Sequence, residues 1–223
     1  MYKGSDARNI SSLKLNDEIF NYLGLYRHPT TVALNIRGVY TLQSNYPLLM
    51  TKRQEFRVIR SYGGFEVREY LPCSIAEVKV SADYASAGSV AFGSLFQYIS
   101  KGNKSSEKIA MTAPVISAQK ADKSDENEWF VSFVMPAGTT LGQLPDPNDP
   151  RVVLRELGAE TCIAASFRGR ATDEVAKRKV AELRALAAKE NIALSDETRI
   201  CRFDPPFKPG VLQYNEIVIP AYL

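Results

Sequence analysis

The chain has 223 residues, of which 28 are Lys or Arg and 25 are Asp or Glu, giving a formal net charge of +3. The basic residues are scattered along the sequence, so we expect no nucleic-acid partner. An apolar content of 45% and a charged content of 24% are ordinary for a globular protein of moderate size. Its three widely spaced cysteines form no C-x-x-C motif, which argues against a disulfide framework or a zinc site and favours a reducing compartment.

Residues 1–53 are predicted to form an N-terminal extension, and residues 54–223 the main domain. Leu13 to Tyr26 shows the apolar spacing of a short amphipathic helix, which His28-Pro29 would end. About 50 residues bury too little surface to be stable alone, so we expect this helix to pack on the main domain. Alternatively, the extension docks a partner, which would make the protein an interaction module. The role of the extension and the oligomeric state are left open.

No run of about 18 apolar residues occurs, so we expect no integral membrane association. The N-terminus lacks the apolar core of a signal peptide, and its acidic residues make it a poor transit peptide. The expected localisation is cytoplasmic. A plastid protein whose targeting segment has been removed is the alternative.

The main domain begins with two strand-like runs around Gly63-Gly64, which predicts a β-hairpin. Tyr84 to Ile99 is predicted to be a helix with Ala87, Val90, Ala91, Leu95 and Tyr98 on one apolar side, of which Ala87, Ala91, Leu95 and Tyr98 are buried against the sheet. Glu107 to Ile116 alternates apolar and polar residues and predicts a strand, bulged or at an edge near its proline. Ala171 to Ala188 has the clearest helical pattern.

An internal repeat organises the domain. Val67-Arg-Glu69 matches Leu154-Arg-Glu156, and each is followed by a strand, a long helix and two further strands. Two β-β-α-β-β units whose sheets pack together would bury the faces that each unit leaves bare. The sequence therefore predicts an α+β fold, a distorted antiparallel β-barrel flanked by two long helices.

Few residues suggest chemistry. Phe92, Phe96 and Ile99 recur at helical spacing; such a stripe is usually core, but here a second apolar face already serves the sheet. The phenylalanines could therefore meet a ligand, the N-terminal helix or another subunit. Glu69 and Glu156 could be acid/base groups, or could pair with the arginines that precede them. With one histidine, at position 28, a hydrolase or metal constellation is not expected, and we assign no catalytic or metal-binding residue.

Several segments resemble the SOUL haem-binding proteins. The similarity covers residues 55 to 220 and rests on motifs spread over the whole domain: Phe65-Glu-Val-Arg-Glu-Tyr70, Tyr98-Ile-Ser-Lys-Gly-Asn103, Glu107-Lys-Ile-Ala-Met-Thr-Ala-Pro-Val-Ile116, Leu144-Pro-Asp-Pro-Asn-Asp-Pro-Arg151, Phe167-Arg-Gly-Arg-Ala171 and Phe203-Asp-Pro-Pro206. The resemblance implies a two-repeat barrel, similar to bacterial effector-binding domains, that binds b-type haem or another tetrapyrrole reversibly as a carrier, buffer or sensor. Some relatives with that fold are hydrolases, so an enzyme using a pocket carboxylate, Glu69 or Glu216, is the alternative.

The resemblance also implies a binding site. A tetrapyrrole would lie on the first long helix against Phe92, Leu95 and Phe96, with Ile99 extending the same stripe, and Lys208 would pair with a propionate. A histidine proposed as axial ligand in one branch of the family falls on Glu69 here, and two basic helix positions fall on Ser89 and Gln97. The resemblance therefore implies binding without a strong axial ligand.

Overall fold

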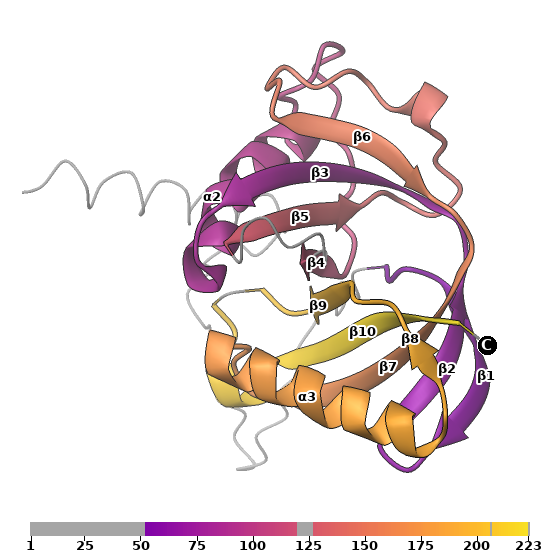
Figure 1. Cartoon of the computed structure of the whole chain (residues 1–223). Coiled ribbons are helices and arrows are strands. Elements are labelled where there is room, and N and C mark those ends of the chain that lie inside the picture. Colours follow the sequence, from indigo (N-terminus) through magenta and orange to yellow (C-terminus); the bar gives the residue numbers. More distant parts are fainter. Residues whose placement is uncertain (1–51, 120–126, 206, 223) are drawn as a thin grey trace, which may run out of the picture. The chain divides into compact units, whose positions relative to one another are not determined.

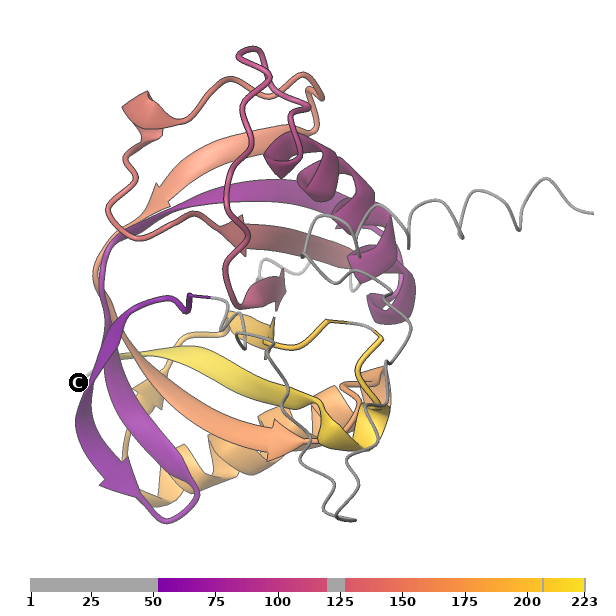
Figure 2. The same cartoon turned by 180° about the vertical axis from the view of Figure 1, so that it is seen from behind.

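The computed structural model describes residues 52–119, 127–205 and 207–222. They belong to a compact unit that runs from Met50 to Leu223, in which two long helices pack on one curled sheet (Figures 1 and 2). The predicted helix at Leu13 to Tyr26 and the histidine lie outside the described residues. The predicted boundary between extension and domain stays a prediction.

The described strands form one ten-stranded antiparallel sheet. Nine of them follow the order β1-β2-β7-β10-β9-β4-β5-β3-β6, and β8 pairs with β10. The elements are β1 (Phe56–Tyr62), β2 (Phe65–Tyr70), β3 (Cys73–Ser81), α2 (Tyr84–Ile99), β4 (Val115–Gln119), β5 (Glu128–Val134), η1 (Leu141–Gln143), β6 (Val152–Leu157), β7 (Glu160–Arg168), α3 (Asp173–Lys189), β8 (Ala193–Leu194), β9 (Thr198–Arg202), η2 (Gly210–Leu212) and β10 (Tyr214–Tyr222). The predicted α+β class is confirmed, with the sheet curled into a half-barrel.

The pairing of the strands reveals the duplication. β2-β3-α2-β4-β5 and β6-β7-α3-β9-β10 have the same element order, and β4 pairs with β9 between them. The first strand of each repeat joins the sheet of the other repeat, since β6 pairs with β3 and β2 pairs with β7. Figure 1 shows the chain running from β2 into β3 and from β6 into β7 across the two halves. The predicted internal repeat is confirmed.

Both long helices begin with a side-chain cap. The Asp83 carboxylate accepts a hydrogen bond of 2.9 Å from the Ser86 amide at the start of α2, and the Thr172 hydroxyl caps α3. α2 packs against β3 and β5, and α3 against β7, β8 and β10. The predicted buried face is confirmed, since Ala87, Ala91, Leu95 and Tyr98 are at most 1% exposed. Val90, assigned to the same apolar side, is instead 52% exposed and lies about 100° around the helix from Ala91.

The predicted strand at Glu107 to Ile116 is wrong over most of its length, because regular pairing starts only with β4. Pro114 has no backbone N–H to donate to a ladder. The Ala113 amide instead donates to the Lys52 carbonyl (2.8 Å), and the Gln54 amide donates to the Ala113 carbonyl (2.9 Å). The segment is therefore a loop that runs from the end of α2 to β4 and pairs with the beginning of the domain.

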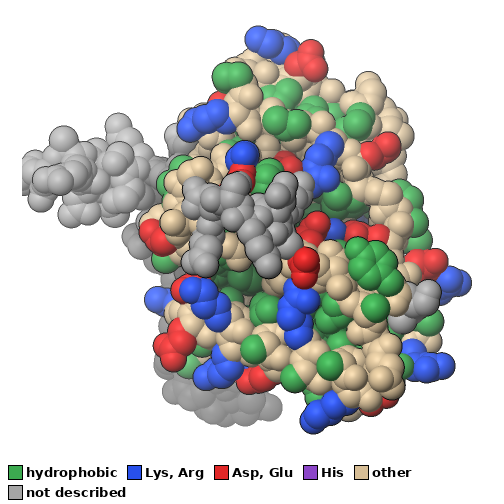
Figure 3. Space-filling model, viewed as in Figure 1, with side chains coloured by type: hydrophobic (Ala, Val, Ile, Leu, Met, Phe, Trp, Pro, Cys, Tyr) green, Lys and Arg blue, Asp and Glu red, His purple; other side chains and the backbone are tan. Residues whose placement is uncertain are grey.

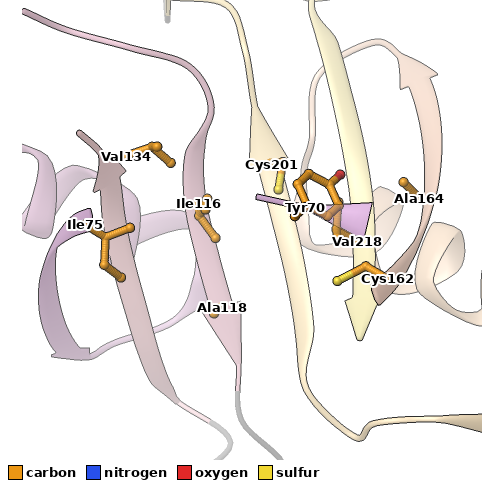
Figure 4. Packing of buried hydrophobic residues seen from close by; sticks show 9 residues of the cluster. All are labelled: Tyr70, Ile75, Ile116, Ala118, Val134, Cys162, Ala164, Cys201 and Val218. Carbon is orange, nitrogen blue, oxygen red and sulfur yellow. The ribbon is translucent and has the colours of Figure 1, made fainter. Parts of the chain in front are cut away.

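The inner face of the curled sheet, opposite the helices, carries an apolar core to which both halves contribute (Figure 4). Strand alternation assigns each residue to one face, so Ile116 and Cys201 point inward while Val115 and Arg202 point to the helix side. The core cluster comprises Tyr70, Ile75, Ile116, Ala118, Val134, Cys162, Ala164, Cys201 and Val218. The domain thus has two apolar layers, one under the helices and one inside the sheet.

Candidate functional site

The predicted aromatic pair on α2 is assembled in the structure. The Phe92 and Phe96 rings are stacked with centroids 5.6 Å apart and planes at 11°. Phe92 also meets the Phe133 ring of β5 edge-on at 5.4 Å. Phe96 is 3% exposed, whereas Phe92 is only half-buried. Phe92 is therefore the member of the stripe whose ring lies at the edge between the core and the surface. We call this edge, with Gly88 and Phe92 on α2 and Val115 on β4, the α2 flank.

The other predicted site residues lie in different surroundings. Leu95 and Ile99 are 0% and 1% exposed and belong to the packed layer under α2. Lys208 lies in the loop that follows β9, where its Nζ forms an ion pair of 2.8 Å with Asp204. No described contact joins Lys208 to α2. The structure thus brings the two phenylalanines together but does not by itself join them to the predicted propionate partner.

α2 itself is uncharged. Its 16 residues, Tyr84-Ala-Ser-Ala-Gly-Ser-Val-Ala-Phe-Gly-Ser-Leu-Phe-Gln-Tyr-Ile99, include no Asp, Glu, Lys or Arg. Small residues also leave room beside it, since a Cβ added at Gly93 would meet no heavy atom within 4 Å. An uncharged helix with an exposed side of small residues and a partly exposed aromatic ring suits a flat apolar ligand.

A second candidate lies on the inner face of the sheet. Arg68 of β2 donates to both carboxylate oxygens of Glu216 on β10, at 2.9 and 3.2 Å, and the Tyr214 hydroxyl donates to the same carboxylate at 2.6 Å. Both charged side chains are buried, 7% and 4% exposed. Burial alone lowers the pKa of Arg68, but its hydrogen bonds to Glu216 offset this and keep that pKa above its usual value. The pair is therefore a fixed ionic contact.

Sequence reasoning did not find the charged pairs inside the sheet. Arg199 pairs with Glu160 and with Glu197, and Arg155 pairs with Glu77 at 2.8 Å. The available signal is a carboxylate inside an otherwise apolar strand, as in Ile75-Ala-Glu-Val78, because such a group is buried only with a partner. In each of these pairs a guanidinium is matched by a glutamate, and Arg199 and Glu77 are the buried members.

The inner face also encloses a small cavity lined by side chains of β1, β2, β4, β9 and β10, among them Phe56, Ile116, Phe203 and Glu216. Its volume is about 10 Å³, which is the space for roughly one water molecule. Pockets that hold drug-sized ligands have volumes of about 300–1,000 Å³. In the described conformation this cavity is therefore too small for such a ligand.

The two repeat-related glutamates are surface residues. Glu156 is exposed, and Glu69 forms an ion pair of 2.6 Å with Arg57, whose side chain is 73% exposed. The alternative pairing of each glutamate with the preceding arginine is wrong. Neighbouring residues of a strand point to opposite faces, so Arg68 turns inward where Glu69 turns outward.

Groups that could bind a haem iron strongly are scarce in the described chain. Residues 52–119, 127–205 and 207–222 contain no cluster of three His, Cys, Asp or Glu side chains able to hold a metal ion. Burial raises the pKa of Cys73 to about 11 and that of Cys162 to about 12. These thiols are protonated at neutral pH, and a protonated thiol is a poor metal ligand.

The described residues form an α+β domain with two helices on a curled antiparallel sheet. This architecture is also found in bacterial effector-binding proteins. The C-terminal domain of EcmrR is similar, with a TM-score of 0.57 and 13% identity over 71% of this chain and 96% of that chain. A hydrolase from Listeria innocua has a TM-score of 0.50 and 14% identity over 74% of this chain and 94% of that one. At these identities the likeness concerns the fold alone.

The sequence places the domain within a family. A family model described as SOUL heme-binding protein matches residues 51–220, so the chain belongs to the SOUL haem-binding family. This is a family of binding proteins, and the hydrolase name belongs to a distant structure. No curated protein sequence matches the chain significantly. The predicted family is confirmed.

Proposed function

We propose that this protein binds haem or a related tetrapyrrole reversibly on the α2 flank and acts as a carrier, buffer or sensor. Membership of the SOUL family supports a tetrapyrrole ligand. The observation that carries the placement is the half-buried Phe92 ring, stacked on Phe96 at the edge of an uncharged helix. A macrocycle laid against Phe92 would extend this stack by one aromatic plane.

The size of the inner cavity supports the outer position. A porphyrin is far larger than the roughly 10 Å³ enclosed near Glu216, whose carboxylate is held by Arg68. Docking on the α2 flank leaves this pair intact.

Binding on the flank does not need an iron–protein bond. Covering one face of the macrocycle removes about 300 Å² of apolar surface from water, worth about 7 kcal/mol before the cost of association at ~25 cal/mol/Å². Micromolar affinity corresponds to about 8 kcal/mol after that cost has been met, so contacts to the propionates must add to the stacking. Lys208, released from Asp204, is the proposed partner of one propionate.

A pair of substitutions on one helix tests the placement. Phe92→Asp puts a charge under the proposed macrocycle and should weaken haem binding at least tenfold, as followed by the Soret band during titration. Val90→Asp is the matched control, because Val90 is 52% exposed and lies about 200° around α2 from Phe92. Its affinity should stay within about twofold of the unchanged protein.

The controls also separate folding from binding. Both variants should keep the far-ultraviolet circular dichroism of the unchanged protein, since neither side chain is fully buried. Equal haem affinity of the Phe92→Asp and Val90→Asp variants would remove the ligand from the α2 flank. Failure of the unchanged protein to bind haem or a metal-free porphyrin would remove the proposed function itself.

Two features support a small-molecule ligand over other partners. On the face shown in Figure 3, Lys and Arg side chains are interspersed with Asp and Glu, without a continuous basic stripe of the kind that follows a nucleic-acid backbone. No helix among the described residues is long and apolar enough to cross a membrane. The absence of nucleic-acid binding, the compartment and the role of the extension stay predictions.

A further inference from the structure

Arg202, the last residue of β9, lies next to the α2 flank. It pairs with Val115 of β4, and Val115 pairs in turn with Phe133 of β5, so these three side chains form one row on the helix side of the sheet. α2 crosses this row. Phe92 meets the Phe133 ring at one end, and Gly88 lies against the Arg202 guanidinium at the other.

Gly88 allows the Arg202 guanidinium to pack closely against α2. A Cβ added at Gly88 would lie 2.8 Å from Nη2 and 3.1 Å from Nη1 of Arg202, so glycine is the residue that allows the approach. Nη2 donates to the Ser117 hydroxyl at 2.7 Å, which holds the guanidinium from the sheet side. Gly88 and Phe92 are four residues apart, so their Cα atoms are separated by about 6 Å along the helix axis.

Arg202 differs from the other arginines inside the domain. Arg68, Arg155 and Arg199 each form two hydrogen bonds with one glutamate. Within the part of the chain that the structure describes, Arg202 has no carboxylate partner, and its Nε is buried without an acceptor. The buried Tyr84 hydroxyl next to it also lacks an acceptor, and the guanidinium lies 5.5 Å from the Tyr84 ring.

From this arrangement we infer that Arg202 binds a carboxylate of the tetrapyrrole and makes the α2 flank selective for tetrapyrroles that carry free propionates. The inference rests on the proposed function. α2 supplies no charge of its own, so the anionic edge of a ligand stacked on Phe92 needs a cation from the sheet. The guanidinium of Arg202 is a planar fork that matches a carboxylate.

The position of the second cation agrees with this role. Lys208 lies in the loop that directly follows Arg202 at the end of β9. Haem carries two propionates on the same edge of its ring. Arg202 takes one of them without losing an existing ion pair, whereas Lys208 must leave Asp204 to take the other. Among the described residues, Arg202 is therefore the carboxylate partner that breaks no existing ion pair.

The experiment compares iron protoporphyrin IX with its dimethyl ester, which has the same ring and no carboxylate. Titrations are followed by the Soret band and by quenching of Trp129, the single tryptophan of the chain, whose ring lies 5.0 Å from that of Tyr84. Arg202→Gln should weaken binding of the free acid roughly tenfold or more and leave the ester unchanged. Arg178→Gln on α3, with a side chain 60% exposed, removes the same charge elsewhere and should change neither affinity.

A second variant guards against a folding defect. Gly88→Ala keeps the charge of Arg202, but the added methyl group displaces its guanidinium from α2. The variant should therefore reduce the preference for the free acid several-fold while ester binding persists. If Arg202→Gln and Gly88→Ala both keep the preference of the unchanged protein, Arg202 is not the carboxylate partner, and the tetrapyrrole function stands. If the unchanged protein binds neither ligand, the proposed function and this inference both fall.

Discussion

Replacing Glu216 by Gln should cost the domain a large part of its stability. The substitution keeps the size of the side chain and removes the charge that Arg68 faces, with both side chains buried. Breaking a buried ion pair from one side costs about 3–5 kcal/mol, because the remaining charge stays desolvated. Arg68 keeps a contact of 2.8 Å to Glu66, which is 37% exposed, so we expect about 3 kcal/mol. For a domain of this size that lowers Tm by about 6–12 °C.

Urea unfolding followed by Trp129 fluorescence measures this loss, since that indole is only 7% exposed in the folded domain. Glu69→Gln is the matched control, because it breaks an exposed pair with Arg57 and should cost less than about 1 kcal/mol. Replacing Arg68 by Met and Glu216 by Leu together should recover most of the loss, since no charge then stays buried. Equal costs for Glu216→Gln and Glu69→Gln would refute the reasoning.

Two further predictions concern pH and a buried amide. The folded Cys73 thiol keeps its proton up to about pH 11, while the unfolded thiol ionises near pH 9, so the free energy of unfolding should fall as pH rises through this window. Urea titrations between pH 8 and pH 11 check this, and Cys73→Ala should flatten the decline. Asn103→Ala removes three hydrogen bonds to the backbone of Tyr98 and Glu107 and should cost about 2 kcal/mol, with faster amide exchange in that loop and not in α3.

The sequence was informative where structure is local. The helical period defined both long helices nearly to the residue. The repeat gave the architecture because its units have the same order of elements. Residues that depend on distant neighbours were not predictable in the same way. Arg68 and Glu216 are 148 residues apart in the sequence, and only the pairing of β2 with β7 and of β7 with β10 brings them together.

In the candidate site, too, the local features were predictable and the contacts between distant residues were not. The stripe of Phe92 and Phe96 was predictable, but the difference in their burial depends on where the sheet ends beneath α2. Arg202 could not be connected with α2 from sequence, because its contact with Gly88 requires β9 to lie beside β4. A glycine in the middle of a helix was the available hint, since it often marks a close approach of another group.

The exchange of first strands between the repeats makes the two halves of the domain depend on each other. Neither half keeps a complete sheet if the chain is divided in the loop between β5 and β6, since each would lose a neighbour at its edge. Two such fragments should therefore recombine, with each supplying the strand that the other lacks. The two halves are also joined twice, through β4–β9 and through the paired β2–β3 and β6–β7 segments, so they cannot swing apart as rigid lobes. Release of a bound tetrapyrrole would then proceed by lifting off the surface, with no hinge to open.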